Sequence, residues 1–111
     1  MRAKLAAVHV VLCNAPPDRA DEIARTLVEE RLAACINLLP VRSVYRWKGQ
    51  LQQDAEVTLL IKVSAERVAA LAQRLRTLHP YELPEIVVLD VNAEHSLAEY
   101  VAWVRGECSG D

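Results

Sequence analysis

Apolar residues along the chain either run together or alternate with polar ones, and both patterns predict strands. The run from Leu5 to Leu12 contains several β-branched residues and predicts a buried strand. Two long extended stretches, residues 36–48 and 51–63, meet at Gly49, so we expect a β-hairpin with its tip near that glycine. A fourth strand is predicted over residues 85–91, where the sequence is again apolar.

Helical spacing of apolar residues occurs three times, between and after these strands. The first helix opens at Pro16-Pro17, since proline is tolerated in the first turn, and its apolar stripe comprises Ile23, Ala24, Leu27, Val28 and Leu32. The second is capped by Ser64 and ends at His79-Pro80, because the residue before a proline avoids the helical region. The capping box Ser96-Leu97-Ala98-Glu99 starts a third helix, which Gly106 ends.

The order of these elements, β-α-β-β-α-β followed by one helix, predicts an α+β fold of the ferredoxin-like, split-βαβ type. Two βαβ halves, residues 5–48 and 50–92, are joined through the hairpin. No linker divides the 111 residues, so we expect a single domain over residues 1–111. Right-handed crossovers place the first and third strands in the centre of the sheet and both helices on one face.

The first and fourth strands are almost continuously apolar, which predicts burial on both faces of the sheet. A sheet with one face in water would alternate apolar and polar residues. Two helices cover only one face, and the third helix is too short to cover the other, so we expect another copy of the chain to pack there. Closed cyclic symmetry would cover the edges of the hairpin as well.

The outer part of the hairpin, residues 44–52, extends beyond what a small domain covers. It carries Tyr45 and Trp47, amphipathic side chains that are typical of interfaces. The alternative is an exposed hairpin with incidental aromatic residues, although large exposed apolar patches are uncommon in monomers.

Composition limits the classes of function. Hydrophobic residues make up 52% of the chain, and the net charge of -2 argues against a nucleic-acid partner. The first apolar run is too short to span a membrane, and no small-residue cleavage site follows it, so we predict no membrane association and a cytoplasmic location. Only three glycines occur, and none forms a phosphate-binding loop.

Three cysteines stand at widely spaced positions without a CxxC pair, so neither a disulfide framework nor a zinc knuckle is predicted. Cys13 ends the first strand just before a helix, where a thiolate would be favoured; the alternative is a small buried apolar side chain. We expect Cys35 to belong to the core and Cys108 to be incidental in the tail.

Four blocks of the sequence resemble the divalent-cation tolerance (CutA) family. They are VLCNAP at residues 11–16, ERLAACIN at 30–37, SVYRWKG at 43–49 and HPYELPEI at 79–86. The blocks follow the family's order and cover nearly the whole chain. The resemblance implies a ferredoxin-like homotrimer whose hairpins wrap around neighbouring subunits, in agreement with the burial pattern.

The resemblance also implies a metal site and a role in tolerance of divalent cations, notably copper. The family's metal contacts would fall on Cys13, His79 and Glu85, a donor set that suits copper or zinc better than magnesium. We expect the divalent ion to be weakly held or absent in a purified sample. The alternatives are a buried thiol at Cys13, a helix C-terminal cation at His79 and an ordinary strand-end carboxylate at Glu85.

The expected trimer is similar to that of the nitrogen-regulatory PII signalling proteins, which bind small ligands in clefts between subunits. By this analogy of fold, a cleft for a small anionic ligand would be lined by Lys62, Tyr45, Trp47, Tyr81 and Pro84. Lys62 interrupts an apolar strand and needs a partner. That partner could be Glu56 or Asp54 on the same strand face, a carboxylate of a neighbouring subunit, or a bound anion.

Two functions are therefore predicted as alternatives: a metal-binding homotrimer, and a small-ligand signalling or scaffold trimer. An enzyme is not predicted, because the positions of the three histidines indicate no set of nucleophile, base and orienting group. Titration of copper against variants of Cys13 and His79 separates the first function from the second.

Overall fold

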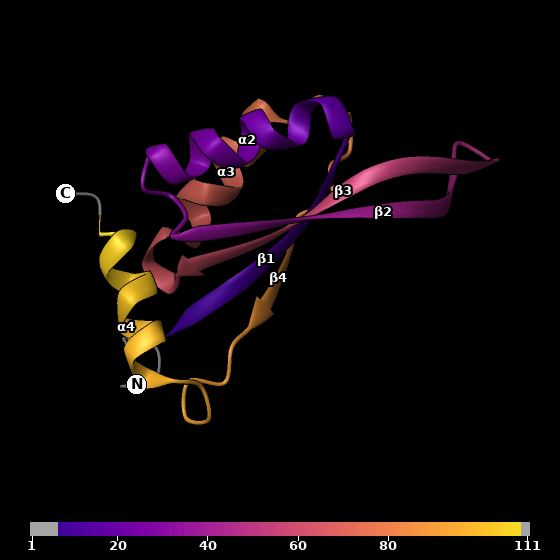
Figure 1. Cartoon of the computed structure of the whole chain (residues 1–111). Helices are drawn as coiled ribbons and strands as arrows, with labels where there is room; N and C mark the ends of the chain where they lie inside the picture. Colours follow the sequence, from indigo (N-terminus) through magenta and orange to yellow (C-terminus); the bar gives the residue numbers. More distant parts are fainter. Residues whose placement is uncertain (1–6, 110–111) are drawn as a thin grey trace.

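The computed structural model describes residues 7–109, which form a four-stranded antiparallel sheet with helices packed against it (Figure 1). The elements follow the predicted order: β1 (Val8–Ala15), α2 (Pro17–Glu29), β2 (Cys35–Trp47), β3 (Gln50–Ser64), the 3-10 turn η1 (Ala65–Arg67), α3 (Val68–Leu78), β4 (Val87–Asp90) and α4 (Ala98–Glu107). The strand order β2-β3-β1-β4 places β1 and β3 in the centre, which confirms the predicted topology. Leu5 and Ala6 of the predicted first strand lie outside the described residues.

The core lies between the sheet and the two longer helices. Figure 1 shows α2 and α3 together over one face of the sheet, with α4 at the end farther from the hairpin tip. Alternate residues of the two central strands are fully buried in this core: Val11, Cys13, Ala15, Leu59, Ile61 and Val63. The helices contribute Ile23, Leu27, Leu71 and Leu75, and each such side chain stabilises the fold by about 1.5–3 kcal/mol on burial.

The hairpin is long because its register continues without a break from the Cys35–Lys62 pair to the Trp47–Gln50 pair. Only Lys48 and Gly49 remain for the loop, and both have positive φ, 50° and 79°. Two such residues make a type I′ turn, whose twist matches that of the strands it joins. The outer half of the hairpin projects past the helices in Figure 1, which confirms the predicted tip.

The ends of the helices differ in detail from the predictions. The chain leaves α2 through Arg31, whose φ of 60° turns the backbone out of the helix. Leu32 is therefore buried in the loop after α2, while Val28 on the helix is exposed. The predicted capping box is wrong: α4 begins after Leu97 without a side-chain cap, because the Ser96 hydroxyl donates to the carbonyl of Asn92 instead.

Two cysteines lie in environments that the sequence did not predict. Cys108, expected to be incidental in the tail, is 1% exposed and belongs to the core, because α4 folds the chain back against β1 and β3. Cys35, expected in the core, is only half-buried at the start of the edge strand β2.

Ser64, expected to cap the second helix, precedes η1 rather than an α-helix and makes no capping hydrogen bond with its side chain.

A single chain does not provide the two-sided burial that the sequence predicts for β4. Val87, Val88 and Leu89 are 44%, 43% and 45% exposed, and the strand is an edge of the sheet. No helix within residues 7–109 has the length and apolar character needed to cross a membrane.

Candidate functional site

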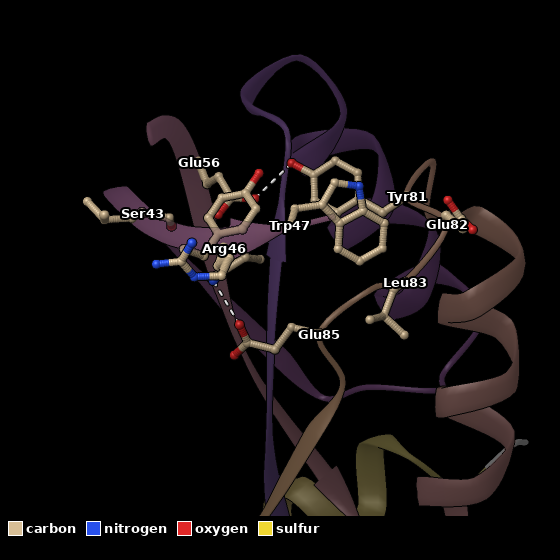
Figure 2. Close-up of a pocket in the computed structure, with 11 residues that line it drawn as sticks. Ser43, Arg46, Trp47, Glu56, Tyr81, Glu82, Leu83 and Glu85 are labelled. Carbon is tan, nitrogen blue, oxygen red and sulfur yellow. Dashed lines mark hydrogen bonds between the residues drawn. The ribbon is translucent and has the colours of Figure 1, made fainter. Parts of the chain in front are cut away.

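A cavity of about 620 Å³ lies where the outer hairpin, the end of β1 and the loop between α3 and β4 meet (Figure 2). The hairpin supplies residues 43–47 and Glu56, β1 supplies Asn14, and the loop supplies residues 81–83 and Glu85. Segments that are far apart in the sequence therefore converge on one pocket, which is partly open to solvent.

Two carboxylates on this pocket are held by neutral donors. Glu56 is only 6% exposed, and its Oε2 accepts a hydrogen bond of 2.7 Å from the Tyr81 hydroxyl. Glu85 is exposed, and its Oε1 accepts a hydrogen bond of 2.9 Å from Nδ2 of Asn14. Figure 2 draws both of these bonds. Each carboxylate therefore has one oxygen engaged and a second oxygen available.

The charge of the pocket is negative on balance. A third carboxylate, Glu82, lies 3.6 Å from Nζ of Lys48 at the hairpin tip. Within residues 7–109, neither Glu56 nor Glu85 is within ion-pair distance of a basic side chain. Three carboxylates thus share the lining with one guanidinium, that of Arg46.

Two phenols beside these carboxylates keep their protons to unusually high pH. Burial and the hydrogen bond to Glu56 raise the pKa of Tyr81. The hydrogen bond that the Tyr45 hydroxyl donates to Asp54 raises the pKa of Tyr45. In both cases the neighbouring negative charge disfavours the phenolate, so both hydroxyl groups remain neutral donors.

Cys13 is not the reactive thiolate that its position before a helix predicts. The side chain is fully buried, and burial raises its pKa to about 12, with the negative charges of Glu85 and Glu56 adding to the shift. Its thiol group donates weakly to the carbonyl of Asn14, at 3.7 Å. Desolvation outweighs the helix N-terminus here, because a charge in the core loses its hydration. The expectation of a lowered pKa is therefore wrong, and the alternative of a buried apolar thiol is the better description.

His79 holds the loop between α3 and β4 against the end of β1. Its Nδ1 accepts a hydrogen bond of 3.2 Å from the backbone N–H of Tyr81, which requires that this nitrogen carries no proton. Nε2 therefore carries the proton and donates to the carbonyl of Asn14 at 2.7 Å. The ring is 7% exposed and both of its nitrogens are engaged, which leaves no free lone pair for a ligand.

The three predicted metal ligands meet around one residue without forming a metal centre. Cys13 and His79 both direct a hydrogen bond to the carbonyl of Asn14, and Glu85 binds the side chain of Asn14. No three His, Cys, Asp or Glu side chains in the described part of the chain are placed to hold a metal ion together. A metal would have to displace the bonds of Cys13 and His79, so this arrangement does not fit a three-ligand site, and the site stays a prediction.

The predicted ligand cleft is only partly assembled within one chain. Tyr45, Trp47 and Tyr81 line the pocket, as expected. Lys62 and Pro84 do not line it. The reason for Lys62 is its register: it pairs with the first residue of β2, at the end of the hairpin opposite to the tip.

Lys62 also has a different partner from those predicted. Its Nζ donates to Oδ1 of Asn37 and lies 4.0 Å from Sγ of Cys35, both on the neighbouring strand. The predicted partners are engaged elsewhere, Glu56 with Tyr81 and Asp54 with Tyr45. The prediction of an intrachain carboxylate partner is therefore wrong.

Two residues important to this pocket escaped the sequence reasoning. Asn14 belongs to the block VLCNAP but was assigned no role, yet its Oδ1 also accepts a hydrogen bond of 2.6 Å from Thr58, so both polar atoms of its side chain are engaged. Glu56 was considered only as a partner of Lys62. Its signal in the sequence was a carboxylate between two apolar residues, Ala55 and Val57, within a predicted strand.

Comparison with known proteins gives matches over almost the whole chain. The CutA1 divalent ion tolerance protein family model matches residues 9–107, which include every residue that lines the pocket. The divalent-cation tolerance protein CutA of Thermus thermophilus is 46% identical over 99 residues, 87% of this chain and 94% of that protein. The human protein CutA is 47% identical over 87 residues, 78% of this chain, and the chain spans about half (48%) of that relative's length.

Solved structures of similar proteins share this fold. The PII-like protein CutA from Nostoc sp., in apo form, has a TM-score of 0.90 at 50% identity, with 93% of this chain and 99% of that chain covered. The periplasmic divalent cation tolerance protein CutA from Archaeoglobus fulgidus has a TM-score of 0.83 at 27% identity, with 91% of this chain and 98% of that chain covered.

Proposed function

The chain belongs to the CutA1 divalent ion tolerance family, and on this premise we propose that it acts in divalent-cation tolerance as a homotrimer that binds a divalent cation. We further propose that it is a binding protein and not an enzyme. The buried thiol of Cys13 stays protonated, and both ring nitrogens of His79 are in hydrogen bonds, so neither is ready to act as nucleophile or base.

The observation that supports cation binding is the pair of carboxylates on the pocket, Glu56 and Glu85. Each keeps one oxygen free, and neither has a cationic partner in the described residues. Their charges contribute to the raised pKa of Cys13, so the potential at this end of β1 is negative. A divalent cation can be held by one or two carboxylates together with water molecules, which is the usual manner of Mg²⁺ in proteins.

Copper is the metal that the resemblance implies, but it makes different demands on the site. Copper prefers imidazole and thiolate donors, so it would have to draw on His79 and Cys13. Both side chains must first give up their bonds to Asn14, and Cys13 must lose its proton from a buried position. A cation bound only through Glu56 and Glu85 needs neither change. The two versions of the proposal therefore predict different effects of substitution.

The trimer is supported by apolar surface that one chain leaves open. The edge strand β4 exposes three consecutive apolar residues, and exposed apolar side chains also occur on the hairpin and on α4: Leu38, Leu39, Val44, Leu51, Leu97, Tyr100 and Trp103. Large exposed apolar side chains of this number suit burial against another copy of the chain. Sedimentation of the full chain at low micromolar concentration tests this: a well-folded monomer would contradict the proposal.

Calorimetric titration with MnCl₂ and with CuCl₂ tests the cation site. We expect Glu85→Gln to weaken Mn²⁺ binding by about tenfold, because one charged ligand is lost. The matched control is Glu94→Gln, an exposed carboxylate outside the pocket. Equal Mn²⁺ affinity in Glu85→Gln and the wild-type chain would exclude the carboxylate site. Unchanged Cu²⁺ affinity in Cys13→Ala and His79→Ala would exclude the thiol–imidazole site.

The cytoplasm is the compartment that we propose. Its support is the presence of three free cysteines in the described residues, which suits a reducing environment. One relative, from Archaeoglobus fulgidus, is described as periplasmic, so fractionation of cells that express this chain decides between the two compartments.

A second candidate function is small-ligand binding of the PII-like kind. The observation that favours it is the size of the pocket, about 620 Å³, which far exceeds the volume of a metal ion and lies in the range of small-molecule sites. The similar Nostoc protein is itself described as PII-like. Co-purification of an organic ligand, or a rise in melting temperature with one, supports this function.

A further inference from the structure

We propose that the pocket beside the hairpin binds organic ammonium ions, held against an aromatic wall by the carboxylates around it. This inference rests on the second candidate function, that the pocket is a small-ligand site, and does not require that a metal binds there. It also replaces the small anion predicted from the sequence with a cation.

The wall of the pocket consists of three aromatic side chains from two segments. Tyr45 and Trp47 lie two residues apart on β2. Tyr81 comes from the loop after α3, and Figure 2 shows it beside Trp47. The faces of aromatic rings carry partial negative charge and attract alkylammonium groups within about 6 Å of the ring centre. A metal ion gains little from such a wall, because it keeps its water shell or takes oxygen ligands instead.

The two phenols are held in a form that strengthens this attraction. Tyr81 donates its hydroxyl to Glu56, and Tyr45 donates its hydroxyl to Asp54. A phenol that shares its proton with a carboxylate carries more electron density on its ring. Both rings are therefore more attractive to a cation than a free tyrosine, and both carboxylates add a negative charge nearby.

The chain already places an ammonium group in such surroundings at the rim of the pocket. Nζ of Lys48 lies 5.5 Å from the centre of the Trp47 ring and 3.6 Å from Oε1 of Glu82. An ammonium between an aromatic face and a carboxylate is the arrangement we propose for the ligand. Trp47 and Glu82 line the cavity, whereas Lys48 is not part of its lining.

The charges and the apolar part of the lining select the class of ligand. Glu82 is already paired with Lys48, so Glu56 and Glu85 face one guanidinium, that of Arg46, and the pocket keeps a net negative charge that disfavours an anion. Leu83 is 66% exposed at the same pocket and offers an apolar contact that suits carbon substituents. Alkylated ammonium ions, which combine positive charge with methyl or methylene groups, match both features.

Binding of choline chloride, compared with its neutral isostere 3,3-dimethyl-1-butanol, tests the charge requirement at constant ionic strength. The readout is fluorescence of Trp47 in a Trp103→Phe background, in which it is the remaining one of two tryptophans. We expect saturable quenching by choline and at least tenfold weaker binding of the isostere. Equal affinities for the two compounds, or no saturable signal from choline, would overturn the inference.

Substitutions locate the binding at the pocket. By calorimetry we expect Trp47→Leu and Tyr81→Leu each to weaken choline binding at least fivefold, whereas Tyr81→Phe, which keeps the ring, loses less. Glu94→Gln is the matched control and should bind like the wild-type chain. Far-UV circular dichroism checks that each variant folds. If Trp47→Leu does not fold, the affinity of Tyr81→Leu for choline decides the result. Choline affinity that is unchanged in both leucine variants would also overturn the inference.

The metal titration and the choline titration test separate proposals, so one proposal can fail while the other holds. Choline binding without Mn²⁺ binding leaves the ammonium site in place and removes the metal proposal. Mn²⁺ binding without choline binding does the reverse. Binding of both, with choline displaced by Mn²⁺ in the wild-type chain but not in Glu85→Gln, would show that they share the negative end of the pocket.

Discussion

Replacement of Tyr81 by phenylalanine removes one hydroxyl group from the pocket and should destabilise the fold by about 1–2 kcal/mol. That hydroxyl donates at 2.7 Å to Glu56, which is 6% exposed and has no cationic partner in the described residues. Hydrogen bonds to charged groups contribute about 1.5–3 kcal/mol. Tyr81 itself is 36% exposed, so water can partly replace the lost donor, which reduces the expected loss to about 1–2 kcal/mol.

Urea unfolding measures this loss, with all variants at the same protein concentration because assembly would add to the apparent stability. The matched control is Tyr100→Phe, which deletes the same atom from an aromatic residue on α4 that is 43% exposed and lies close to Cys35 rather than to a carboxylate. We expect the control to change the free energy of unfolding by less than about 0.5 kcal/mol. Equal losses in the two variants would refute the reasoning.

A double-mutant cycle with Glu56→Gln separates the charge from the hydroxyl. If Tyr81 stabilises the fold through the charge of Glu56, the two substitutions should be non-additive by at least about 0.5 kcal/mol. Additive losses would show that the hydroxyl acts through other contacts, and the account of the pocket's electrostatics would then fail.

Three further predictions follow from burial and backbone conformation. Because the folded pKa of Cys13 is about 12, against an ordinary 9.0, the unfolded chain releases this proton first. The free energy of unfolding, measured with urea, should therefore fall as pH rises from 9 to 12. Cys13→Ala should make this dependence on pH less steep, by up to about 1.4 kcal/mol per pH unit. Iodoacetamide should label half-buried Cys35 well before Cys13 and Cys108, as peptide mass spectrometry would show. Gly49→Ala should cost about 1–2 kcal/mol in urea unfolding, since φ is 79° and no atom obstructs a Cβ.

The fold could be predicted because its signals are long and repeated. The hairpin extends over residues 35–64, and the alternation of apolar and polar residues along its second strand fixes which face is buried. A register shift of one residue would move the apolar side chains to the other face. The end of α3 at His79-Pro80 follows from local sterics. The prediction of where α4 starts depended instead on one hydroxyl group, that of Ser96. This hydroxyl could either cap the helix or donate to the carbonyl of Asn92, and it does the latter.

The site could be predicted only in part, because its residues are brought together by register and by a loop. Tyr45 and Trp47 share a strand face and were grouped correctly. The partner of Lys62 lies on the adjacent strand, and the partner of Glu56 lies 25 residues farther along the chain, so neither pairing leaves a local pattern. For Cys13 the sequence left both a thiolate and a buried apolar thiol open, because it shows that a helix follows but not how deeply the sulfur is buried.

Asn14 explains how a pocket that is formed partly by a loop is held in place. It ends the central strand β1, and its side chain is fixed by Thr58 on β3 and by Glu85. Its carbonyl accepts a hydrogen bond from Nε2 of His79, whose Nδ1 accepts one from the backbone N–H of Tyr81. The loop therefore takes its position from the centre of the sheet rather than from its own conformation. The cation that we propose at Glu85 would therefore act on this same network through Asn14.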